Sequence, residues 1–302
     1  AAEAKVDERY LKEWLASNAA RGYVSYDAEA DKFSLTPEQA SVFARESEPT
    51  CIQGLIQGVV GQFVKEDVAI DVFKTGRGRP WGEHHECCFC GTERFFRPAY
   101  AGHLLDEWIP ALDGVEDKLK LGAKVADIGC GLGTSSILMA EQFPNSTIHA
   151  FDFHGPSIEE AKKRANEKGL SNLEFFVSDA GEIPKNDYDL ACIFDAWHDM
   201  GDPVGIAASI KETLSKDGTF MVVEPMALDG YANNIANNPA SAMMYGFGTL
   251  VCVPASKAQS VGLGLGPQAG PSKLMELLSE AGFGNVNLAA ETTNNLVLQA
   301  RG

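Results

Sequence analysis

The sequence is poor in basic residues and has no long hydrophobic run. Among its 302 residues, 25 are Lys or Arg and 42 are Asp or Glu, so the formal net charge is −17. A nucleic-acid binder needs a basic face that neutralises phosphates, and an anionic membrane surface also attracts basic proteins. The charge therefore argues against both kinds of partner. No apolar run reaches the roughly 18 residues that a membrane-spanning helix requires.

The sequence also lacks an export signal and an even set of cysteines. Residues 1–14 are charged and amphipathic, as in the middle of a helix rather than at a natural start, so we expect a processed or truncated chain. Seven cysteines in a chain of this size favour reduced thiols and a cytoplasmic location over a disulfide framework. With 45% hydrophobic and 22% charged residues, the chain is expected to be globular, and its length favours two domains.

The pattern changes near residue 100, which predicts one domain over 1–100 and a second over 101–302. The first begins with apolar residues at helical spacing, followed by two short alternating segments that flank a turn. A helix followed by a two-stranded wing is the back half of a winged-helix module. The expected elements are a helix, a hairpin, two helical regions and a locally basic link, over 4–24, 23–35, 38–45, 50–73 and 76–80.

From residue 101 onward, predicted strands alternate with predicted helices. This order is typical of an α/β domain with a mostly parallel sheet covered by helices on both faces. The expected strands lie at 124–128, 147–152, 173–177, 189–194, 219–224, 285–290 and 295–300. The expected helices lie at 134–143, 156–168, 203–215 and 272–281. An insert over 227–270 interrupts the alternation, and the last two strands are expected to form an antiparallel hairpin at the sheet edge.

A glycine-rich loop joins the first strand of this domain to its first long helix. Glycines at 129, 131 and 133 let the backbone turn sharply and approach a ligand closely, and the following helix presents free N–H groups. The third glycine comes one residue earlier than in the dinucleotide fingerprint. Asp127 stands two positions before the first glycine. An acidic group near the loop suits a positively charged ligand better than a pyrophosphate.

Polar residues follow the next two strands as well. Asp152 ends the second strand, where a carboxylate can accept hydrogen bonds from both ribose hydroxyls, and Ser178-Asp179-Ala180 ends the third strand. Each signal alone is weak, because a glycine loop can be a simple turn and an aspartate can cap a helix. All three stand at the carboxyl ends of successive strands, where open α/β sheets bind ligands.

The loop of the form D-x-G-x-G-x-G resembles motif I of class I S-adenosylmethionine (SAM) methyltransferases. That family places adenine contacts after the third strand. The segment Phe194–Pro203 resembles the His-Asp segment of winged-helix small-molecule O-methyltransferases, in which the histidine is the general base. His198 is the matching position, and Asp199 or Glu224 would orient it. Alternatively, His198 caps the next helix or packs under Trp197.

The resemblance covers roughly residues 5–301. It includes Glu13-Trp14-Leu15, Gly22-Tyr23-Val24, Gly91–Arg97, Glu107–Asp113 and the segment His198–Pro203. It implies a Rossmann-like seven-stranded methyltransferase sheet behind an N-terminal winged-helix domain that serves dimerisation and pocket closure. The implied reaction transfers the methyl group of SAM to a small molecule and leaves S-adenosylhomocysteine. Met200 stands where the family usually has Trp, which leaves O- and S-methylation both open.

The resemblance and the strand ends together give the expected site residues. The expected cofactor contacts are Asp127, Gly129, Gly131, Gly133, Asp152, Phe153, Ser178, Asp179, Ala180 and Asp195. The expected catalytic residues are His198 and Asp199, and the expected substrate contacts are Phe95, Tyr100, Trp197, Met244 and Tyr245. The aromatic residues and the Met-rich part of the insert are equally compatible with core packing or a dimer contact.

The run His84–Cys90 is rich in metal-type ligands, but its spacing is too crowded for a structural zinc site and no second Cys pair follows. Cys87 and Cys90 read as C-x-x-C, a redox pair or soft-metal site. We favour a plain segment between the domains and expect no metal.

Two other function classes remain open. One is a winged-helix transcriptional regulator with a ligand-sensing α/β domain, which would need a basic recognition helix. The other is a dehydrogenase, against which the displaced third glycine argues.

Overall fold

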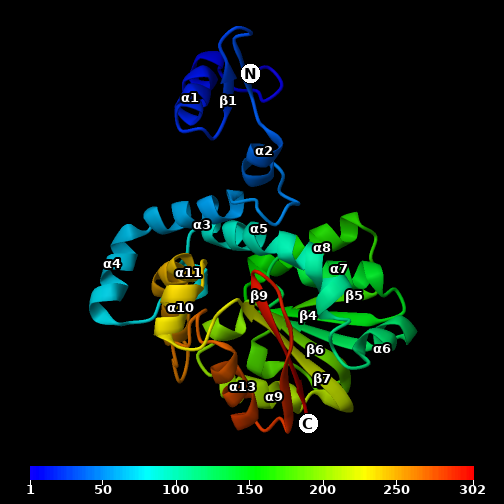
Figure 1. Ribbon diagram of the computed structural model, residues 1–302. Helices are drawn as coiled ribbons and strands as arrows, with labels where there is room; N and C mark the ends of the chain where they lie inside the picture. The colour runs from blue at the N-terminus through cyan, green and yellow to red at the C-terminus, as the bar shows by residue number, and fades with distance from the viewer.

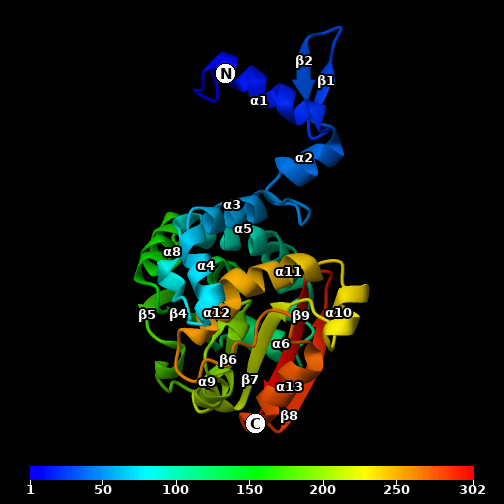
Figure 2. The same ribbon diagram turned by 90° about the vertical axis from the view of Figure 1, so that its left-hand side faces the viewer.

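The structure is a computed structural model that describes residues 1–302. Residues 1–45 stand apart from the main body in two perpendicular views (Figure 1, Figure 2). This part consists of a helix, a hairpin and a second helix: α1 (Glu8–Ala20), β1 (Ser25–Asp27), β2 (Lys32–Ser34) and α2 (Pro37–Phe43). Asp7 caps α1 by accepting from the N–H groups of Arg9 and Tyr10, and Thr36 and Gln39 form a capping box on α2. The predicted order of elements is therefore confirmed here.

Helices α3 (Gln53–Phe63) and α5 (Glu86–His103) lie over the main body. Between them come α4 (Glu66–Thr75) and a 3₁₀ turn (Trp81–Glu83), and a π turn (Leu104–Trp108) follows α5. The predicted helical region 50–73 is thus two helices, and the cysteine run begins α5. Residue 100 falls inside α5, so no loop lies at the predicted boundary between the two domains. The division into domains at this residue stays a prediction.

Glycines let α3 and α5 pack at very short range. A Cβ atom built on Gly91 of α5 would lie 2.4 Å from the backbone nitrogen of Gly58 in α3. A Cβ atom on Gly54 would lie 2.4 Å from the backbone nitrogen of Phe95. Because any larger residue would collide with backbone rather than with a movable side chain, these glycines fix the distance between the two helices.

A seven-stranded sheet forms the centre of the body, as predicted (Figure 1). Its strands are β3 (Lys124–Ile128), β4 (Thr147–Asp152), β5 (Leu173–Val177), β6 (Tyr188–Phe194), β7 (Leu214–Pro225), β8 (Asn285–Glu291) and β9 (Asn295–Arg301). The order is β5-β4-β3-β6-β7-β9-β8. Strands β3 to β7 are parallel, and β9 is antiparallel to both of its neighbours. The chain order reverses beside β3, which creates a crevice at the carboxyl ends of β3 and β6.

Helices cover both faces of the sheet. They are α6 (Val115–Leu121), α7 (Thr134–Gln142), α8 (Gly155–Glu167), α9 (Pro203–Lys211) and α13 (Pro271–Glu280), with 3₁₀ turns at Ala180–Glu182 and Trp197–Asp199. The predicted helix 203–215 ends early at Lys211. The Thr213 hydroxyl donates to the carbonyl of Ile210 at 2.7 Å and so satisfies one of its last free carbonyls. None of the helices is long and apolar enough to cross a bilayer.

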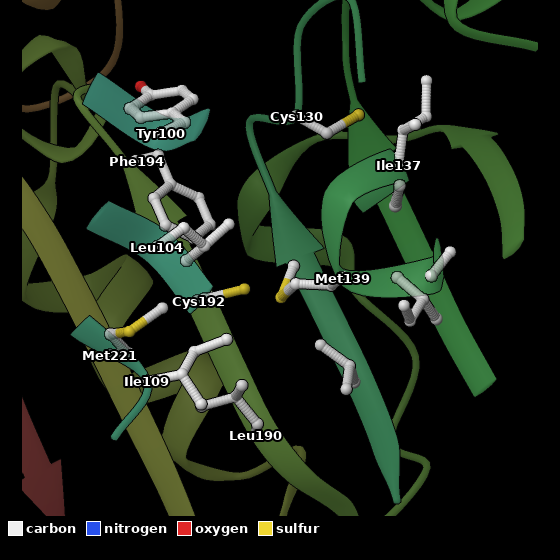
Figure 3. Close-up of a cluster of buried hydrophobic side chains, with 14 of the residues drawn as sticks. Tyr100, Leu104, Ile109, Cys130, Ile137, Met139, Leu190, Cys192, Phe194 and Met221 are labelled. Atoms are coloured by element: carbon white, nitrogen blue, oxygen red, sulfur yellow. The ribbon is translucent and has the colours of Figure 1, made fainter. Parts of the chain in front are cut away.

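Alternate side chains of each central strand enter two separate cores. On β6, Leu190, Cys192 and Phe194 join a cluster of 28 buried residues, whereas Ala191 and Ile193 join a cluster of 22 on the opposite face. Figure 3 shows part of the first cluster, to which residues 99–109 also contribute. This end of α5 is therefore built into the core that supports the sheet.

The insert 227–270 forms a helical cap. Its elements are α10 (Tyr231–Asn237), α11 (Ser241–Phe247), a π turn (Gly248–Cys252) and α12 (Val253–Lys257). The cap lies beside α3 and α4 in both views (Figure 1, Figure 2), and a Cβ atom on Gly58 would touch the Phe247 ring at 3.5 Å. The cap and α5 thus approach the carboxyl end of the sheet from different sides.

Candidate active site

A cavity of about 250 Å³ opens at the carboxyl ends of β3, β4, β5 and β6. Its other walls come from α3, α5 and the cap. Most of the predicted site residues line it. They are Phe95, Tyr100, Gly129, Gly131, Asp152, Phe153, Ser178, Asp179, Ala180, Asp195, His198, Asp199 and Met244. Residues far apart in the sequence therefore meet where the topology predicts a ligand.

The glycine loop borders this cavity with its backbone. Gly131 has φ +54°, and an added Cβ would meet nothing within 4 Å, so its backbone is open to a ligand. Gly133 has φ +79° and does not line the cavity. A Cβ there would lie 2.9 Å from the Phe175 ring, so this glycine lets the start of α7 pack closely against β5. Its predicted contact with the cofactor stays a prediction.

Asp152 is fixed at the end of β4 by two backbone donors. Its Oδ2 accepts from the N–H of Gly131 at 2.9 Å, and its Oδ1 accepts from the N–H of His154 at 2.8 Å. Burial raises the pKa of this carboxyl, while the two N–H groups lower it. Each oxygen keeps a lone pair for a further donor in the cavity.

Asp127 lies behind the loop and does not line the cavity. It is fully buried, and its Oδ2 accepts from the hydroxyls of Ser135 at 2.7 Å and Ser136 at 2.5 Å. These bonds tie the first turn of α7 to β3. Asp127 therefore lies behind the cavity wall rather than on it, and its predicted contact with the cofactor stays a prediction.

Asp127 should make the protein less stable as the pH rises. Burial raises its pKa from 3.8 to about 6, so between these values the folded state holds a proton that the unfolded state has lost. The free energy of unfolding then falls with rising pH across that window, by about 3 kcal/mol at most. Urea unfolding at pH 4 and pH 7 should show that Asp127→Asn removes this part of the decline. The exposed Asp106→Asn should keep it, and identical pH profiles for the wild type and Asp127→Asn would contradict the assignment.

Asp195 directly follows β6 in a strained conformation, with φ +47°. Its Oδ2 accepts from the Tyr100 hydroxyl at 2.7 Å, and its Oδ1 accepts from Nδ2 of Asn295 at 2.9 Å. Burial and the nearby Glu224 raise the pKa of Asp195 well above its usual range. These bonds join α5, β6 and β9 under the cavity. Strain of this kind persists where the surrounding structure holds it, often at functional sites.

His198 lies buried between two carboxylates. Its Nδ1 is 2.5 Å from Oε2 of Glu224, and its Nε2 is 3.2 Å from Oδ1 of Asp199. The other Glu224 oxygen accepts from the N–H groups of Trp197 and His198. Burial lowers the pKa of His198, but the two carboxylates outweigh it, so the pKa lies well above its usual range. The Cys252 thiol of the cap completes this cluster.

Trp197 and Tyr245 do not line the cavity, so the structure does not support them as substrate contacts. Trp197 is fully buried in the second core and donates from Nε1 to the carbonyl of Pro203 at 3.0 Å. Tyr245 stacks on Tyr231 at 5.8 Å between ring centroids. Sequence spacing did not reveal which way either ring points.

Two cavity residues carry roles that the sequence did not indicate. Glu93 of α5 accepts from the Thr134 hydroxyl at 2.8 Å and pairs with Arg97 and Arg164, which fastens α5 to the start of α7. Cys252 stands 54 positions after His198, and no local motif connects the two. Only the Gly91–Arg97 run, which carries the family resemblance, could have drawn attention to Glu93.

The lining of the cavity is rich in acidic side chains and has no lysine or arginine. Five carboxylate side chains face the cavity, and no lysine or arginine does; the five belong to Glu93, Asp152, Asp179, Asp195 and Asp199. Apolar residues make up about half of the wall, 21 of 40. The cavity therefore suits a ligand with a positive centre and an apolar neighbour, and it opposes phosphate groups.

Two family models match different parts of the chain. A family model described as "Methyltransferase domain" matches residues 119–282, more than half of the chain. The chain belongs to this methyltransferase family. A second model, the Rv2258c-like winged HTH domain, matches residues 1–45, the part that stands apart from the body. Both halves of the predicted family architecture are thereby confirmed.

Curated relatives of the methyltransferase domain range from a sterol 24-C-methyltransferase to a tRNA (guanine-N(7)-)-methyltransferase. Sterol 24-C-methyltransferase ERG6A of Gibberella zeae is 31% identical over 172 residues, which are 56% of this chain and 42% of that protein. The chain thus spans less than half the length of this curated relative.

Solved structures share the whole fold at low identity. Human N-acetylserotonin methyltransferase in complex with SAM has a TM-score of 0.68 and 18% identity, covering 100% of this chain and 85% of the other. An O-methyltransferase family protein from Burkholderia thailandensis has a TM-score of 0.68 and 13% identity, covering 100% and 86%. These likenesses confirm the methyltransferase fold together with its N-terminal extension.

Proposed function

We propose that this protein is a SAM-dependent methyltransferase that acts on an oxygen or sulfur atom of a small molecule. The observation that carries the proposal is the cavity at the strand ends, which combines an open glycine loop with five carboxylates and no basic side chain. SAM supplies a methyl group made electrophilic by its sulfonium, and a site rich in carboxylates favours that positive charge. A dinucleotide pyrophosphate would meet repulsion in the same place, which argues against a dehydrogenase.

The chain's own residues would hold SAM as follows. Asp152, already oriented by two N–H groups, has lone pairs left for the ribose hydroxyls. Ser178, Asp179 and Ala180 would border the adenine, and the backbone of Gly131 would lie along the amino-acid part. Asp195 would face the positive end of the ligand. S-adenosylhomocysteine would leave the same site after transfer.

The acceptor would occupy the part of the cavity between α5 and the cap. Phe95, Phe96, Met243, Met244 and Phe247 form an apolar wall there. Because no basic side chain faces this space, we infer a neutral, largely apolar acceptor rather than a carboxylate or phosphate. His198 stands at the floor beside this space, and Glu224 holds its ring in place.

The proposal is tested by adding SAM and a panel of neutral phenols, alcohols and thiols and following release of S-adenosylhomocysteine. We expect SAM to bind with 1:1 stoichiometry, NAD not to bind, and at least one neutral acceptor to be methylated. Anionic acceptors of the same size should react much more slowly. An absence of SAM binding by calorimetry would refute the proposal.

A regulatory function is less well supported. Residues 1–45 carry eight Asp or Glu against six Lys or Arg, a net charge of −2, so they have no excess of positive charge to attract DNA phosphates. We propose that this module instead contributes to a homodimer. Large apolar side chains of this module remain exposed, Tyr10 to 78% and Trp14 to 60%. A molar mass in solution equal to one 32.4 kDa chain would contradict the dimer.

A cytoplasmic location stays a prediction from the cysteine content.

A further inference from the structure

His198, Asp199 and Cys252 form the one group of three His, Cys or acidic residues in this chain with the spacing of a metal site. Their ligand atoms, a ring nitrogen, a carboxylate oxygen and a sulfur, all lie within 4.8 Å of one another. Zn²⁺ takes these three kinds of atom at about 2.0–2.3 Å, which sets tetrahedral ligands roughly 3.3–3.7 Å apart. Small side-chain shifts would therefore bring the three atoms onto one ion.

The histidine already has the orientation that a metal requires. Glu224 lies 2.5 Å from Nδ1 and is itself fixed by two backbone N–H groups. A histidine that binds a metal through one ring nitrogen usually donates from the other nitrogen to a carboxylate or carbonyl. Nε2, which faces Asp199, is thus the nitrogen left for an ion.

Asp199 supplies an oxygen without a partner. Its Oδ1 is buried and accepts no hydrogen bond, although Nε2 of His198 is only 3.2 Å away. A buried carboxylate oxygen with no donor is costly. An ion between the nitrogen and this oxygen would satisfy both atoms.

The surroundings favour a dication that binds sulfur. His198 is 3% exposed and Cys252 is 7% exposed, so both are shielded from bulk water, and no lysine or arginine lines the cavity. Thiolate and imidazole ligands select Zn²⁺ and similar ions over Mg²⁺ or Ca²⁺. Cys252 lines the cavity, whereas Cys87 and Cys90 of the cysteine run do not, so these two thiols do not belong to the same cluster.

We propose that His198 Nε2, an Asp199 oxygen and Cys252 Sγ bind a thiophilic divalent cation, represented by Zn²⁺, with the fourth position open to the cavity. Three protein ligands and one open position are the arrangement of catalytic zinc sites. The metal is bound by residues of the floor and the cap together, so it also fastens the cap to the sheet.

The consequence for the reaction rests on the proposed function. The open position would take the sulfur of an acceptor thiol, whose proton leaves to solvent water. A sulfur lone pair then forms a bond to the methyl carbon of SAM, while the bond from that carbon to the sulfonium breaks and its electron pair stays on the departing sulfur. A thioether and S-adenosylhomocysteine result. In this state His198 is a ligand, and the acceptor class is an apolar thiol.

The test is titration of the full chain with Co²⁺ after treatment with a chelator. Co²⁺ serves as the spectroscopic probe because a Co²⁺–thiolate bond gives a charge-transfer absorption band. We expect one Co²⁺ per chain, displaced by Zn²⁺, and no band in Cys252→Ala. Asp199→Asn should weaken binding more than tenfold, and Glu224→Gln should weaken it by about 10- to 100-fold.

Cys90→Ser is the matched control, since it removes a half-buried thiol of the cysteine run on α5 and should leave the band unchanged. A band that survives Cys252→Ala or disappears in Cys90→Ser would overturn the proposal, as would no binding by wild-type protein. Circular dichroism of each variant shows whether it is folded. If Cys252→Ala is not folded, Asp199→Asn alone decides.

Calorimetry with SAM keeps the two proposals separate. Metal binding without SAM binding would refute the methyltransferase function and leave the metal site intact. Methyl transfer by protein that binds no Co²⁺ would refute the metal site and leave the methyltransferase function intact.

Discussion

His198→Ala is expected to lower methyl transfer by about 100- to 10,000-fold and to leave SAM affinity nearly unchanged. The imidazole stands on the proposed acceptor side of the cavity between Glu224 and Asp199, whereas all the residues proposed for SAM except Asp195 come from the glycine loop and the ends of β4 and β5. Whether His198 removes the acceptor proton or holds an ion, its loss removes the group that activates the acceptor.

Asp152→Ala should give the opposite result, with weak SAM binding. Calorimetry for SAM and initial rates at saturating SAM separate the two effects. His103→Ala is the control, because this histidine lies on α5 outside the cavity and pairs with Glu107 at 3.0 Å. Full turnover in His198→Ala, or loss of its SAM binding, would contradict the assignment.

Gly91→Val is expected to destabilise the protein and abolish turnover. A Cβ atom at this position would lie 2.4 Å from the backbone nitrogen of Gly58, so α3 must move away from α5. Overpacking of this kind costs about 1–3 kcal/mol and can cost more when only backbone is available to yield. The displaced helices carry Gly54, Gly58, Phe95 and Phe96 of the cavity wall, so the acceptor site opens.

Gly102→Ala is the matched control, since it lies on the same helix and its added Cβ would meet nothing within 4 Å. We expect it to keep or slightly raise stability, because alanine favours a helix more than glycine does. Thermal unfolding and S-adenosylhomocysteine release measure the two consequences. If Gly91→Val unfolds at the wild-type temperature with normal turnover, the close packing of α3 and α5 is not required.

Features that depend on neighbouring residues could be predicted from the sequence. The alternation of strands and helices, the final hairpin and the glycine loop each follow from a local pattern, and the structure and the family match confirm them. The positions of Asp152 and Ser178–Ala180 at the cavity follow from topology, because parallel strands end at one edge. The split of 50–73 into two helices did not show in the composition.

The sequence by itself determined the fold family, the location of the ligand edge and the acidic character that disfavours nucleic acid. The fold family rests on the resemblance of short motifs such as the glycine loop, whereas the ligand edge and the acidic character follow from short-range periodicity and composition, which a single sequence displays directly. The tertiary structure alone decided that Asp127 and Trp197 turn away from the cavity and that Glu224 holds His198. It also decided that Cys252 joins them from the cap. Glu224 and Cys252 stand 26 and 54 positions after His198, and only the folded backbone brings them to it and sets the direction in which each side chain points.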